Sequence, residues 1–586
     1  MQWRWSEVPY CAEKAESLQR ALRIHPVLCQ LLVQRGVETY EDARKFFRPN
    51  LSDLHPPFLM KDMDKAIARL EKAIHTGEKI LIYGDYDVDG TTAVAMVYSF
   101  LKEIYPRVDY YVPHRYTEGY GISKKGIDFA AQEGFSLIIA LDCGIKAHDK
   151  IEYAASKHID FIICDHHLPD AVLPNAVAVL DPKRSDCPYP FKELSGCGIG
   201  FKLLQAYCEK SGLPSDTCYR YLDLLCLSIG ADIVPITGEN RILARYGLDK
   251  INTNPSPGIR RLLEVSGLVL PPDAVPPQSD NPPAIQLRKK LNINDVVFIL
   301  APRINAAGRI DDARHAVKLL IGEAQDAEMI ERAYQLEKLN SERKDLDRDI
   351  TAHALSIIES DERLMKQNTT VVYHPSWHKG VLGIVASRLT ENYYRPTIVL
   401  TEGEDGVLTG SARSVKNFDL YEAIYACREH LIQFGGHQFA AGLTLRKEKI
   451  ADFCLAFEEV VSSRIQPDQL IPEIEVNAVI EPEIITPGFY KILSEMAPFG
   501  PGNMNPTFMS RQMRDTGWSK IVKEEHLRLS LCKNTPAAYT GIAFGMAAKL
   551  PLLKNGPVDV VYHVEENEWN GRVSIEWVIK DLRAAI

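Results

Sequence analysis

Short apolar runs that end in aspartate recur along the first half of the chain. The run Lys79–Tyr83 leads through Gly84 into a turn that holds Asp85, Asp87 and Asp89, and a helix-like run follows from residue 91. This pattern predicts a strand, an acidic turn and a helix. Three carboxylates this close repel one another unless a cation offsets their charge. A solvated acidic loop is the plain alternative for this turn taken alone.

The same arrangement recurs in the two apolar runs that follow. The run 136–141 ends in Asp142, and the run 159–164 ends in Asp165, His166 and His167. Helix-like segments separate the runs, so we expect βα units of a parallel sheet. The carboxyl ends of parallel strands lie along one edge, where open α/β sheets bind ligands. These side chains should therefore converge there, with Asp232 as a further candidate after an apolar helix-like run.

The rest of the chain divides by composition. Residues 1–76 favour helices, and no Pro or Gly occurs from Glu323 to Leu364, which predicts a long helix that connects two lobes. Alternating runs at 473–480, 558–564 and 573–579 predict a small barrel or sandwich. An oligonucleotide-binding barrel and a purely structural β-domain both remain open. Two runs rich in turn-forming residues, 252–288 and 498–506, are expected to be loops.

Several loops carry side chains suited to phosphate. Arg115 lies in a glycine-flanked loop after the expected strand 108–112, and Arg303 and Asn305 lie in what is expected to be a tight turn. An ordinary surface loop and a helix-capping turn are the alternatives. Further along, a hydroxyl beside an arginine and a diglycine suit a nucleic-acid backbone, although a histidine there is often simply packed. These residues are Ser411, Arg413, Gly435, Gly436 and His437.

Composition narrows the class of protein. The chain has 586 residues, of which 46% are hydrophobic and 25% charged, as in an ordinary globular protein of several domains. Its net charge of −10 gives no overall basic footprint, so any contact with nucleic acid must be local. Twelve cysteines without a Cys-x-x-Cys pair indicate reduced thiols in the cytoplasm. No apolar run approaches the length of a membrane span.

The ordered motifs resemble those of the DHH phosphoesterase superfamily. They are Gly84–Gly90, Asp142–Gly144, Asp165–His167 and Gly230–Asp232. Together with Arg303–Arg309, the run 380–389 and Gly435–His437, they make the chain similar to the RecJ family of single-strand-specific exonucleases. The resemblance implies an α/β fold with a parallel-sheet DHH domain, a long connecting helix, a smaller α/β DHHA1 domain and an OB-like nucleic-acid-binding β-domain. After the N-terminal helical segment 1–76, the corresponding ranges are 77–320, 321–365, 366–462 and 463–586.

The resemblance also implies two divalent cations, Mn²⁺ or Mg²⁺. Oxygen ligands with an imidazole suit these ions, and two of them activate water and stabilise the leaving oxygen of a phosphodiester. Many relatives have histidine where this chain has Tyr83, which leaves one ligand position open. The implied ligands are Asp85, Asp87, Asp142, His166 and Asp232, with Asp142 as the bridge. Asp89, Asp165 and His167 would support them or contact the scissile phosphate.

The implied activity is 5′→3′ hydrolysis of single-stranded DNA to mononucleotides, in repair and recombination. A pocket for the terminal 5′-phosphate would be formed by Arg115, Arg303, Asn305, Ser411 and Arg413. Implied partners are single-stranded DNA, a single-strand-binding protein and a RecQ-type helicase, with the enzyme a monomer. Two alternatives are a DHH-family oligoribonuclease or cyclic-dinucleotide phosphodiesterase, which is usually shorter, and an inactive single-strand-binding homologue, which should have lost acidic positions.

Overall fold

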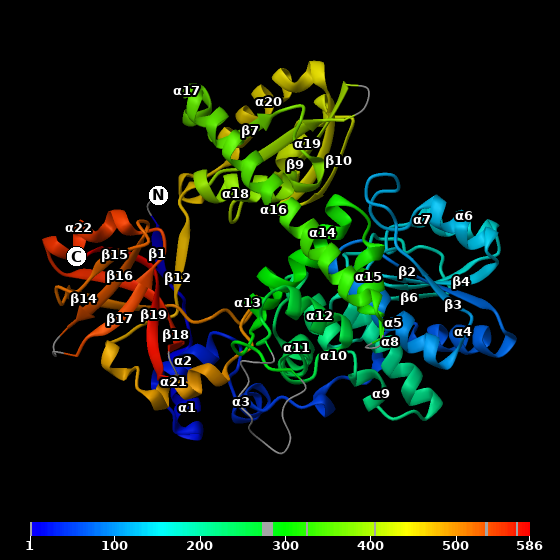
Figure 1. The fold of residues 1–586 in the computed structure, drawn as a ribbon, viewed down its shortest axis with the longest axis horizontal. Coiled ribbons are helices and arrows are strands. Elements are labelled where there is room, and N and C mark those ends of the chain that lie inside the picture. The colour runs from blue at the N-terminus through cyan, green and yellow to red at the C-terminus, as the bar shows by residue number, and fades with distance from the viewer. Residues whose placement is uncertain are drawn as a thin grey trace. The chain divides into compact units, whose positions relative to one another are not determined.

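The computed structural model describes residues 3–271, 285–323, 326–403, 406–533, 537–569 and 572–585. The chain forms two compact units. Their helices and strands are labelled in Figure 1. We call Cys11–Asn340 with Lys491–Asn505 the N-terminal unit. The C-terminal unit holds Met1–Tyr10, Ser341–Tyr490 and Pro506–Ile586.

A five-stranded parallel sheet organises the N-terminal unit. Its strand order is β3-β2-β4-β5-β6. The strands are β2 (Lys79–Gly84), β3 (Val108–Tyr111), β4 (Phe135–Leu141), β5 (Asp160–Cys164) and β6 (Ala178–Leu180). The parallel α/β fold predicted from the apolar runs is thus confirmed.

Helices cover both faces of this sheet (Figure 1). Ile80 and Ile82 of β2 face a core shared with α4, α5 and α8, while Leu81 and Tyr83 face a second core shared with α6 and α7. Strand residues therefore alternate between two apolar layers, which explains why the runs are continuously hydrophobic. The helices concerned are α4 (Met63–Thr76), α5 (Val88–Ile104), α6 (Lys124–Gln132), α7 (His148–Ser156) and α8 (Gly196–Ser211).

Helices make up most of the remaining N-terminal unit. Thr39 caps α3 in a reciprocal capping box with Asp42, as sequences of this type favour. The helices are α1 (Ala12–Leu22), α2 (Pro26–Val33), α3 (Tyr40–Phe47), α9 (Asp216–Tyr219), α10 (Leu222–Ala231), α11 (Gly238–Thr253), α12 (Pro257–Val265), α13 (Ile293–Asp295), α14 (Ala301–Ile310) and α15 (Arg314–Leu320).

Three expectations about local structure need correction. The expectation of a tight turn around Arg303 is wrong, because these residues form α14, where alanines favour a helix. A Cβ on Gly308 would lie 2.8 Å from the Tyr86 carbonyl oxygen, so glycine lets this helix pack against the turn after β2. The loop expected over 252–288 contains α12, and its proline-rich part, 272–284, lies outside the described residues. Within the described residues 3–76, the regular structure is helical except for β1 (Arg4–Glu7), a strand too short to show a period.

The long helix α16 runs from Glu328 to Ser360, and the division between the two units falls within it, after Asn340. It is followed by α17 (Glu362–Lys366). A mixed five-stranded sheet of order β10-β11-β9-β8-β7 comes next. Its elements are β7 (Thr370–Tyr373), α18 (Leu382–Tyr393), β8 (Thr397–Glu402), β9 (Val407–Arg413), α19 (Leu420–Ala426), β10 (Gln433–His437), β11 (Ala440–Arg446) and α20 (Ile450–Arg464).

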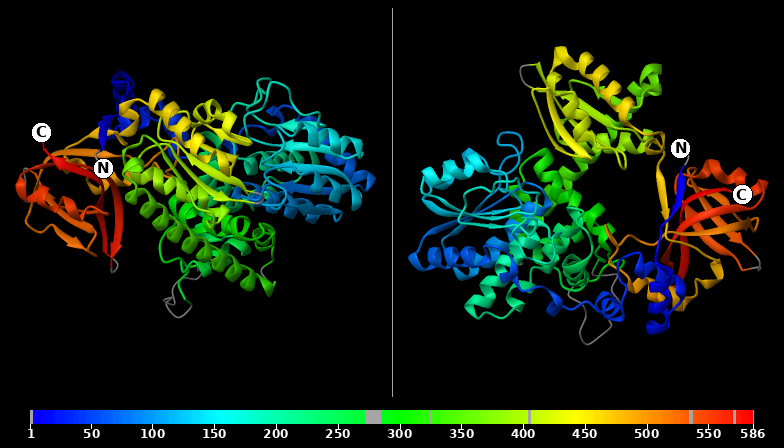
Figure 2. Two further views of the ribbon diagram at one scale, coloured as in Figure 1. Left: turned by 90° about the horizontal axis from the view of Figure 1, so that it is seen from above. Right: turned by 180° about the vertical axis from the view of Figure 1, so that it is seen from behind.

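The last part of the chain is a closed β-structure. β14 pairs with both β18 and β16, so the strands β14-β18-β19-β17-β16 form a ring, which is how a barrel removes its free edges. β1 lies parallel beside β12 (Glu473–Val476) (Figure 2). The remaining elements are β13 (Ala478–Val479), α21 (Pro487–Glu495), β14 (Phe508–Asp515), β15 (Lys520–Val522), β16 (His526–Cys532), β17 (Tyr539–Ala543), α22 (Leu550–Asn555), β18 (Val558–Trp569) and β19 (Arg572–Ala584).

Candidate metal centre

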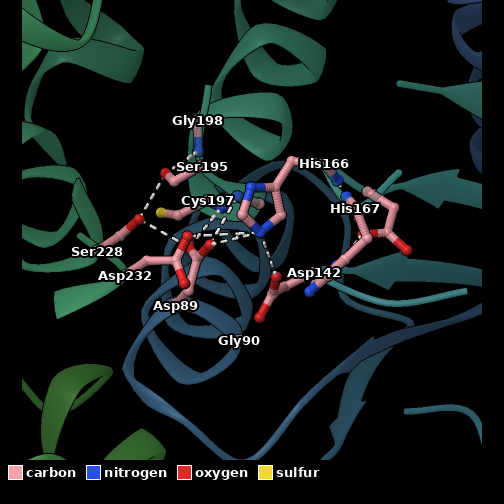
Figure 3. A network of polar contacts seen from close by, with 12 residues as sticks. Asp89, Gly90, Asp142, His166, His167, Ser195, Cys197, Gly198, Ser228 and Asp232 are labelled. Atoms are coloured by element: carbon pink, nitrogen blue, oxygen red, sulfur yellow. Dashed lines mark hydrogen bonds and ion pairs between the residues drawn. The ribbon is translucent and has the colours of Figure 1, made fainter. Parts of the chain in front are cut away.

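Acidic side chains meet at the carboxyl-terminal edge of the parallel sheet, as predicted. Asp85 follows β2, Asp142 follows β4 and Asp165 follows β5, while Asp232 caps the C-terminus of α10. His166 stands at the centre of this group (Figure 3). Its Nε2 lies 3.2 Å from Asp142 Oδ1, 3.5 Å from Asp232 Oδ2 and 3.8 Å from Asp89 Oδ2.

Several atoms of this cluster are buried but have no hydrogen-bond partner among the described residues. They are Asp85 Oδ2, Asp142 Oδ1 and both ring nitrogens of His166. Buried polar atoms are rarely left without a partner, because each costs about 1–3 kcal/mol of desolvation. The pattern therefore indicates that this cluster binds a ligand, because no described side chain forms a hydrogen bond with these atoms.

Several carboxyls of this cluster have raised pKa values. Burial, together with neighbouring Asp89 and Asp87, raises the pKa of Asp142 well above its ordinary value. Burial and Asp87 do the same to the pKa of Asp85, and burial with Asp89 raises the pKa of Asp232 to about 8. A divalent cation would relieve both the desolvation and the mutual repulsion.

Among the described residues, two groups of ligand atoms are close enough to hold an ion. One is Asp142, His166 and His167, and the other is Asp89, His166 and Asp232; within each, the atoms lie within 4.8 Å of one another. Three carboxylates and imidazole nitrogens form a donor set that fits Mn²⁺ or Mg²⁺. Of the expected ligands, Asp85 and Asp87 lie outside both groups.

Asp89 binds the surrounding backbone. Its Oδ2 accepts a hydrogen bond from Gly196 N at 2.7 Å, and its Oδ1 accepts from Cys197 N at 2.8 Å and Ser228 Oγ at 2.7 Å. The carboxylate thereby ties the starts of α5 and α8 to α10 (Figure 3). Glycine is needed at position 196 for the start of α8 to lie this close to the site, since a Cβ there would lie 2.5 Å from Asp142 Cβ.

Asp85 and Asp87 shape the turn between β2 and α5. Asp87 caps α5 by accepting from Gly90 N at 3.0 Å, and Asp85 Oδ1 accepts from Gly121 N at 3.0 Å. A Cβ on Gly90 would lie 2.4 Å from the Asp85 carbonyl oxygen. The glycine therefore lets the helix start directly against the end of the strand.

Asp165 and His167 form a charged pair. Asp165 Oδ1 accepts from His167 Nδ1 at 2.7 Å and from His166 N at 2.8 Å, while Oδ2 accepts from Ile145 N at 2.9 Å. Burial alone would raise the pKa of Asp165, but these contacts hold it at about 2. Burial likewise opposes the charge on His167, yet Asp165 raises its pKa to about 9. His167 is therefore cationic at neutral pH.

The loop after β3 closes over this cluster. Tyr120 Oη donates to the Asp142 carbonyl at 3.1 Å and lies 3.2 Å from His167 Nε2, and the Arg115 guanidinium lies over the Tyr86 ring at 4.9 Å. Tyr83 anchors this loop to strand β2: its Oη donates to Gly121 O at 3.0 Å and accepts from Ser123 N at 3.1 Å. The phenol at this position thus bonds to loop backbone.

The predicted phosphate-binding residues differ in how free their side chains are. Arg303 is buried in α14, pairs with Glu337 and donates to Ile299 O. Part of its guanidinium is therefore occupied by contacts within the protein. Asn305 is half-buried on the same helix. Both belong to the N-terminal unit, as does Arg115.

The C-terminal unit holds the other predicted phosphate-binding residues. On β9, Arg413 donates to Ser411 Oγ at 3.1 Å, and no described carboxylate pairs with it, while burial lowers its pKa. A Cβ on Gly383, in the first turn of α18, would lie 2.8 Å from Arg413 Nη2. Gly435, Gly436 and His437 are exposed on β10, so the packed-histidine alternative is wrong.

Sequence reasoning missed three contributors. Asp181 follows β6 and is fully buried, with Oδ2 unpartnered among the described residues and a pKa raised by burial to about 7. The run 178–180 ending in Asp181 repeats the strand-then-aspartate pattern and could have revealed it. Ser195 and Ser228, which hydrogen-bond at 2.6 Å beside Asp89, carry no such signal.

Three family descriptions match successive parts of the chain. They are the DHH family N-terminal domain over residues 79–229, the DHHA1 domain over 366–463 and the RecJ OB domain over 476–581. The matches follow the order of the parallel sheet, the mixed sheet and the barrel. The OB description also selects between the two alternatives left open for the last β-domain.

Curated relatives match almost the whole chain. The single-stranded-DNA-specific exonuclease RecJ of Bacillus subtilis (strain 168) is 35% identical over 99% of this chain and 70% of its own length. The protein of the same name from Escherichia coli (strain K12) is 31% identical over 97% and 98%. Among solved structures, RecJ of Thermus thermophilus in complex with Mn²⁺ has a TM-score of 0.82 at 26% identity, covering 99% of this chain and 79% of that one.

Proposed function

Because the chain belongs to the RecJ family of single-stranded-DNA-specific exonucleases, we propose that it degrades single-stranded DNA from the 5′ end and releases mononucleotides, in DNA repair and recombination. It is a hydrolase of phosphodiester bonds. The observation that carries the proposal is the buried cluster around His166, whose unpartnered oxygens and raised carboxyl pKa values call for a cation.

We propose as metal ligands the five residues that the family resemblance implies, of which Asp142, His166 and Asp232 belong to the groups around His166. Asp85, Asp87, Asp142, His166 and Asp232 would hold two ions, Mn²⁺ or Mg²⁺, with Asp142 shared. Relatives solved with Mn²⁺ and with Mg²⁺ support the choice of metal. Asp89 lies near enough to be an additional ligand, but its bonds to Gly196, Cys197 and Ser228 support a positioning role.

The side chains around the ions have separable tasks. Bound divalent cations supply an activated water and offset negative charge on the leaving oxygen. Asp165 orients the cationic His167, which presents a charged donor toward a phosphate oxygen. Tyr120 bonds to His167 and to the Asp142 carbonyl, and so fixes the distance between donor and cluster.

Recognition of the 5′ end is proposed for the predicted phosphate-binding residues. Arg413 is half-buried, bonds to Ser411 and has no described carboxylate partner, so it retains positive charge for an anion. The exposed diglycine of β10 allows a nucleic-acid backbone to approach. Arg115 has its guanidinium stacked but not ion-paired among the described residues.

We also propose protein partners, an oligomeric state and a compartment. A single-strand-binding protein and a RecQ-type helicase are the proposed protein partners, and a monomer is the proposed state. Over the described ranges, no helix has the length and apolar character that a bilayer crossing requires. All twelve cysteines are free thiols, which supports the cytoplasm as the proposed compartment.

End-labelled oligonucleotides test the proposal. Single strands carrying a 5′-phosphate or a 5′-hydroxyl, each labelled at the 3′ end, are incubated with the full chain and Mn²⁺, beside an identical duplex. We expect laddered shortening of the 5′-phosphorylated single strand, slower attack on the 5′-hydroxyl form and an intact duplex. Asp142→Asn should abolish cleavage. Immediate release of the 3′ label as a mononucleotide would contradict the direction.

A further inference from the structure

A loop from far along the chain packs on the turn that carries Asp232. Lys491–Asn505 belongs to the N-terminal unit, although the residues on both sides of it, Tyr490 and Pro506, belong to the other unit. We call Pro498–Asn503 the PFGPGN loop after its sequence. Its many turn-forming residues were visible in the sequence, but the proposed function gives them no task.

The backbone of the PFGPGN loop meets the backbone of this turn. Ile236 N donates to Pro501 O at 2.6 Å. A Cβ on Gly500 would lie 2.6 Å from Ile236 Cγ1, and one on Gly502 would lie 2.9 Å from Thr237 Cγ2. Only glycine allows the two segments to lie this close, so the glycines are explained by this contact.

The turn itself is strained. It joins α10 to α11, beginning at Asp232, and Ile233 has a φ of +60° with 65% of its surface exposed. A β-branched residue rarely adopts this conformation, and such strain persists only where the surroundings hold it. Asn240, fully buried, donates to Pro235 O at 3.1 Å. Pro501 O makes the second hydrogen bond to this turn, which it accepts from Ile236 N, one residue after Pro235.

The loop is in turn anchored to the N-terminal unit. Arg241 donates to Ala497 O at 3.1 Å and to Pro498 O at 3.3 Å. Arg35 donates from Nε to Asn503 Oδ1 at 2.7 Å, and buried Asn503 donates to Pro498 O at 2.8 Å. These bonds fix the loop as a rigid support.

We propose that the PFGPGN loop is a positioning element for Asp232. By holding Ile236 and Thr237, it keeps the strained turn in place and thereby fixes the Asp232 carboxylate 3.5 Å from His166 Nε2. The inference rests on the proposed function, because it takes Asp232 to be a cation ligand. The fourth ligand-bearing segment of the site is thus held by residues more than 260 positions away in the sequence.

A glycine substitution with a matched control tests this. In Gly500→Ala the new methyl must displace Ile236, whereas in Gly488→Ala, shortly before this loop in the sequence, the nearest atom is 3.9 Å away. Mn²⁺ binding to the full chain without DNA is measured by the loss of the free Mn²⁺ electron paramagnetic resonance signal. We expect the dissociation constant to rise at least fivefold in Gly500→Ala and to be unchanged in Gly488→Ala.

Asp232→Asn separates the two claims. If Asp232→Asn binds Mn²⁺ as the wild type does, the ligand assignment of the proposed function fails. If Asp232→Asn binds weakly while folded Gly500→Ala binds normally, the positioning role of the loop is overturned. If Gly500→Ala does not fold, Mn²⁺ binding of Gly502→Ala is compared with that of Gly517→Ala instead. Both glycines have positive φ, but only Gly502 has a neighbour within 4 Å of an added Cβ.

Discussion

At the scale of single residues, the aspartates of the site fall into two kinds. Asp89 and Asp165 accept hydrogen bonds on both oxygens, whereas Asp85 and Asp142 each keep one buried oxygen without a hydrogen bond among the described residues. The first kind orients its neighbours and the second kind is left for a cation. The apolar runs predicted all four residues, but only the family resemblance divided them into ligands and supporting residues, because the distinction depends on backbone N–H groups supplied by distant segments such as Gly196.

The Tyr83 phenol connects strand β2 to the loop after β3. We predict that Tyr83→Phe keeps the ring packing against Tyr111, whose centroid lies 5.3 Å away, but leaves Ser123 N and Gly121 O without the phenol. Stability should fall by about 1–3 kcal/mol, the usual cost of orphaned buried groups. Because Gly121 N bonds to Asp85, Mn²⁺ affinity should fall too.

Thermal unfolding and Mn²⁺ titration of Tyr83→Phe measure the two effects. Tyr153→Phe is the matched control, since it removes a phenol that bonds to Asp128 on the helical layer of the same sheet. An unchanged Mn²⁺ affinity in Tyr83→Phe would show that the loop after β3 holds Asp85 without the phenol.

At the scale of elements, glycines at helix starts decide how closely helices approach the strand ends. Gly90 brings α5 against Asp85 and Gly196 brings α8 against Asp142. The predicted strand–turn–helix units gave the correct edge of the sheet for the site. The contribution of α8 could not be predicted, because its start is brought to the site by folding rather than by sequence spacing.

Gly196→Ala should damage the site through Asp142. The new Cβ would lie 2.5 Å from Asp142 Cβ, so either α8 or the aspartate must shift. We expect exonuclease activity to fall at least tenfold and stability by about 1–3 kcal/mol, as for other overpacked sites. Gly198→Ala, two residues along the same helix with its nearest atom at 3.4 Å, should behave much like the wild type. Equal activities of the two variants would refute the argument.

The barrel should lose stability in mild acid because of His563. Its Nδ1 lies 2.9 Å from Pro506 O, and burial lowers its pKa to about 4. The unfolded chain takes up a proton near the ordinary pKa of about 6.5, whereas the folded chain does not. Stability is therefore complete above pH 6.5 and declines as the pH falls toward 4.

Melting temperatures at pH 7.5 and pH 5.5 measure the effect of His563. The difference between the two should be smaller in His563→Gln than in the wild type, since glutamine does not titrate. An identical difference in both proteins would show that other groups cause the acid sensitivity.

At the scale of the whole molecule, local patterns predicted the parallel sheet, the long helix and a small barrel or sandwich, and the family resemblance gave their order as domains. Contacts between remote segments were beyond such reasoning. The pairing of β1 with β12 joins residues more than 460 positions apart. Residues 491–505 contact Ile236 in the turn after Asp232, although the residues on both sides of this segment belong to the other unit. Arg303 illustrates the same limit, because its partner Glu337 lies on a different helix.

We propose that buried carboxylates from separate segments tolerate one another because they share two divalent ions. Equilibrium Mn²⁺ binding to the full chain, counted by electron paramagnetic resonance in the wild type and in Asp142→Asn, measures these ions. We expect two ions per wild-type chain and a clear loss in the variant, from which the shared ligand is missing. A wild-type chain that takes up no Mn²⁺ at millimolar concentration, or a variant that still binds two ions with wild-type affinity, would contradict it.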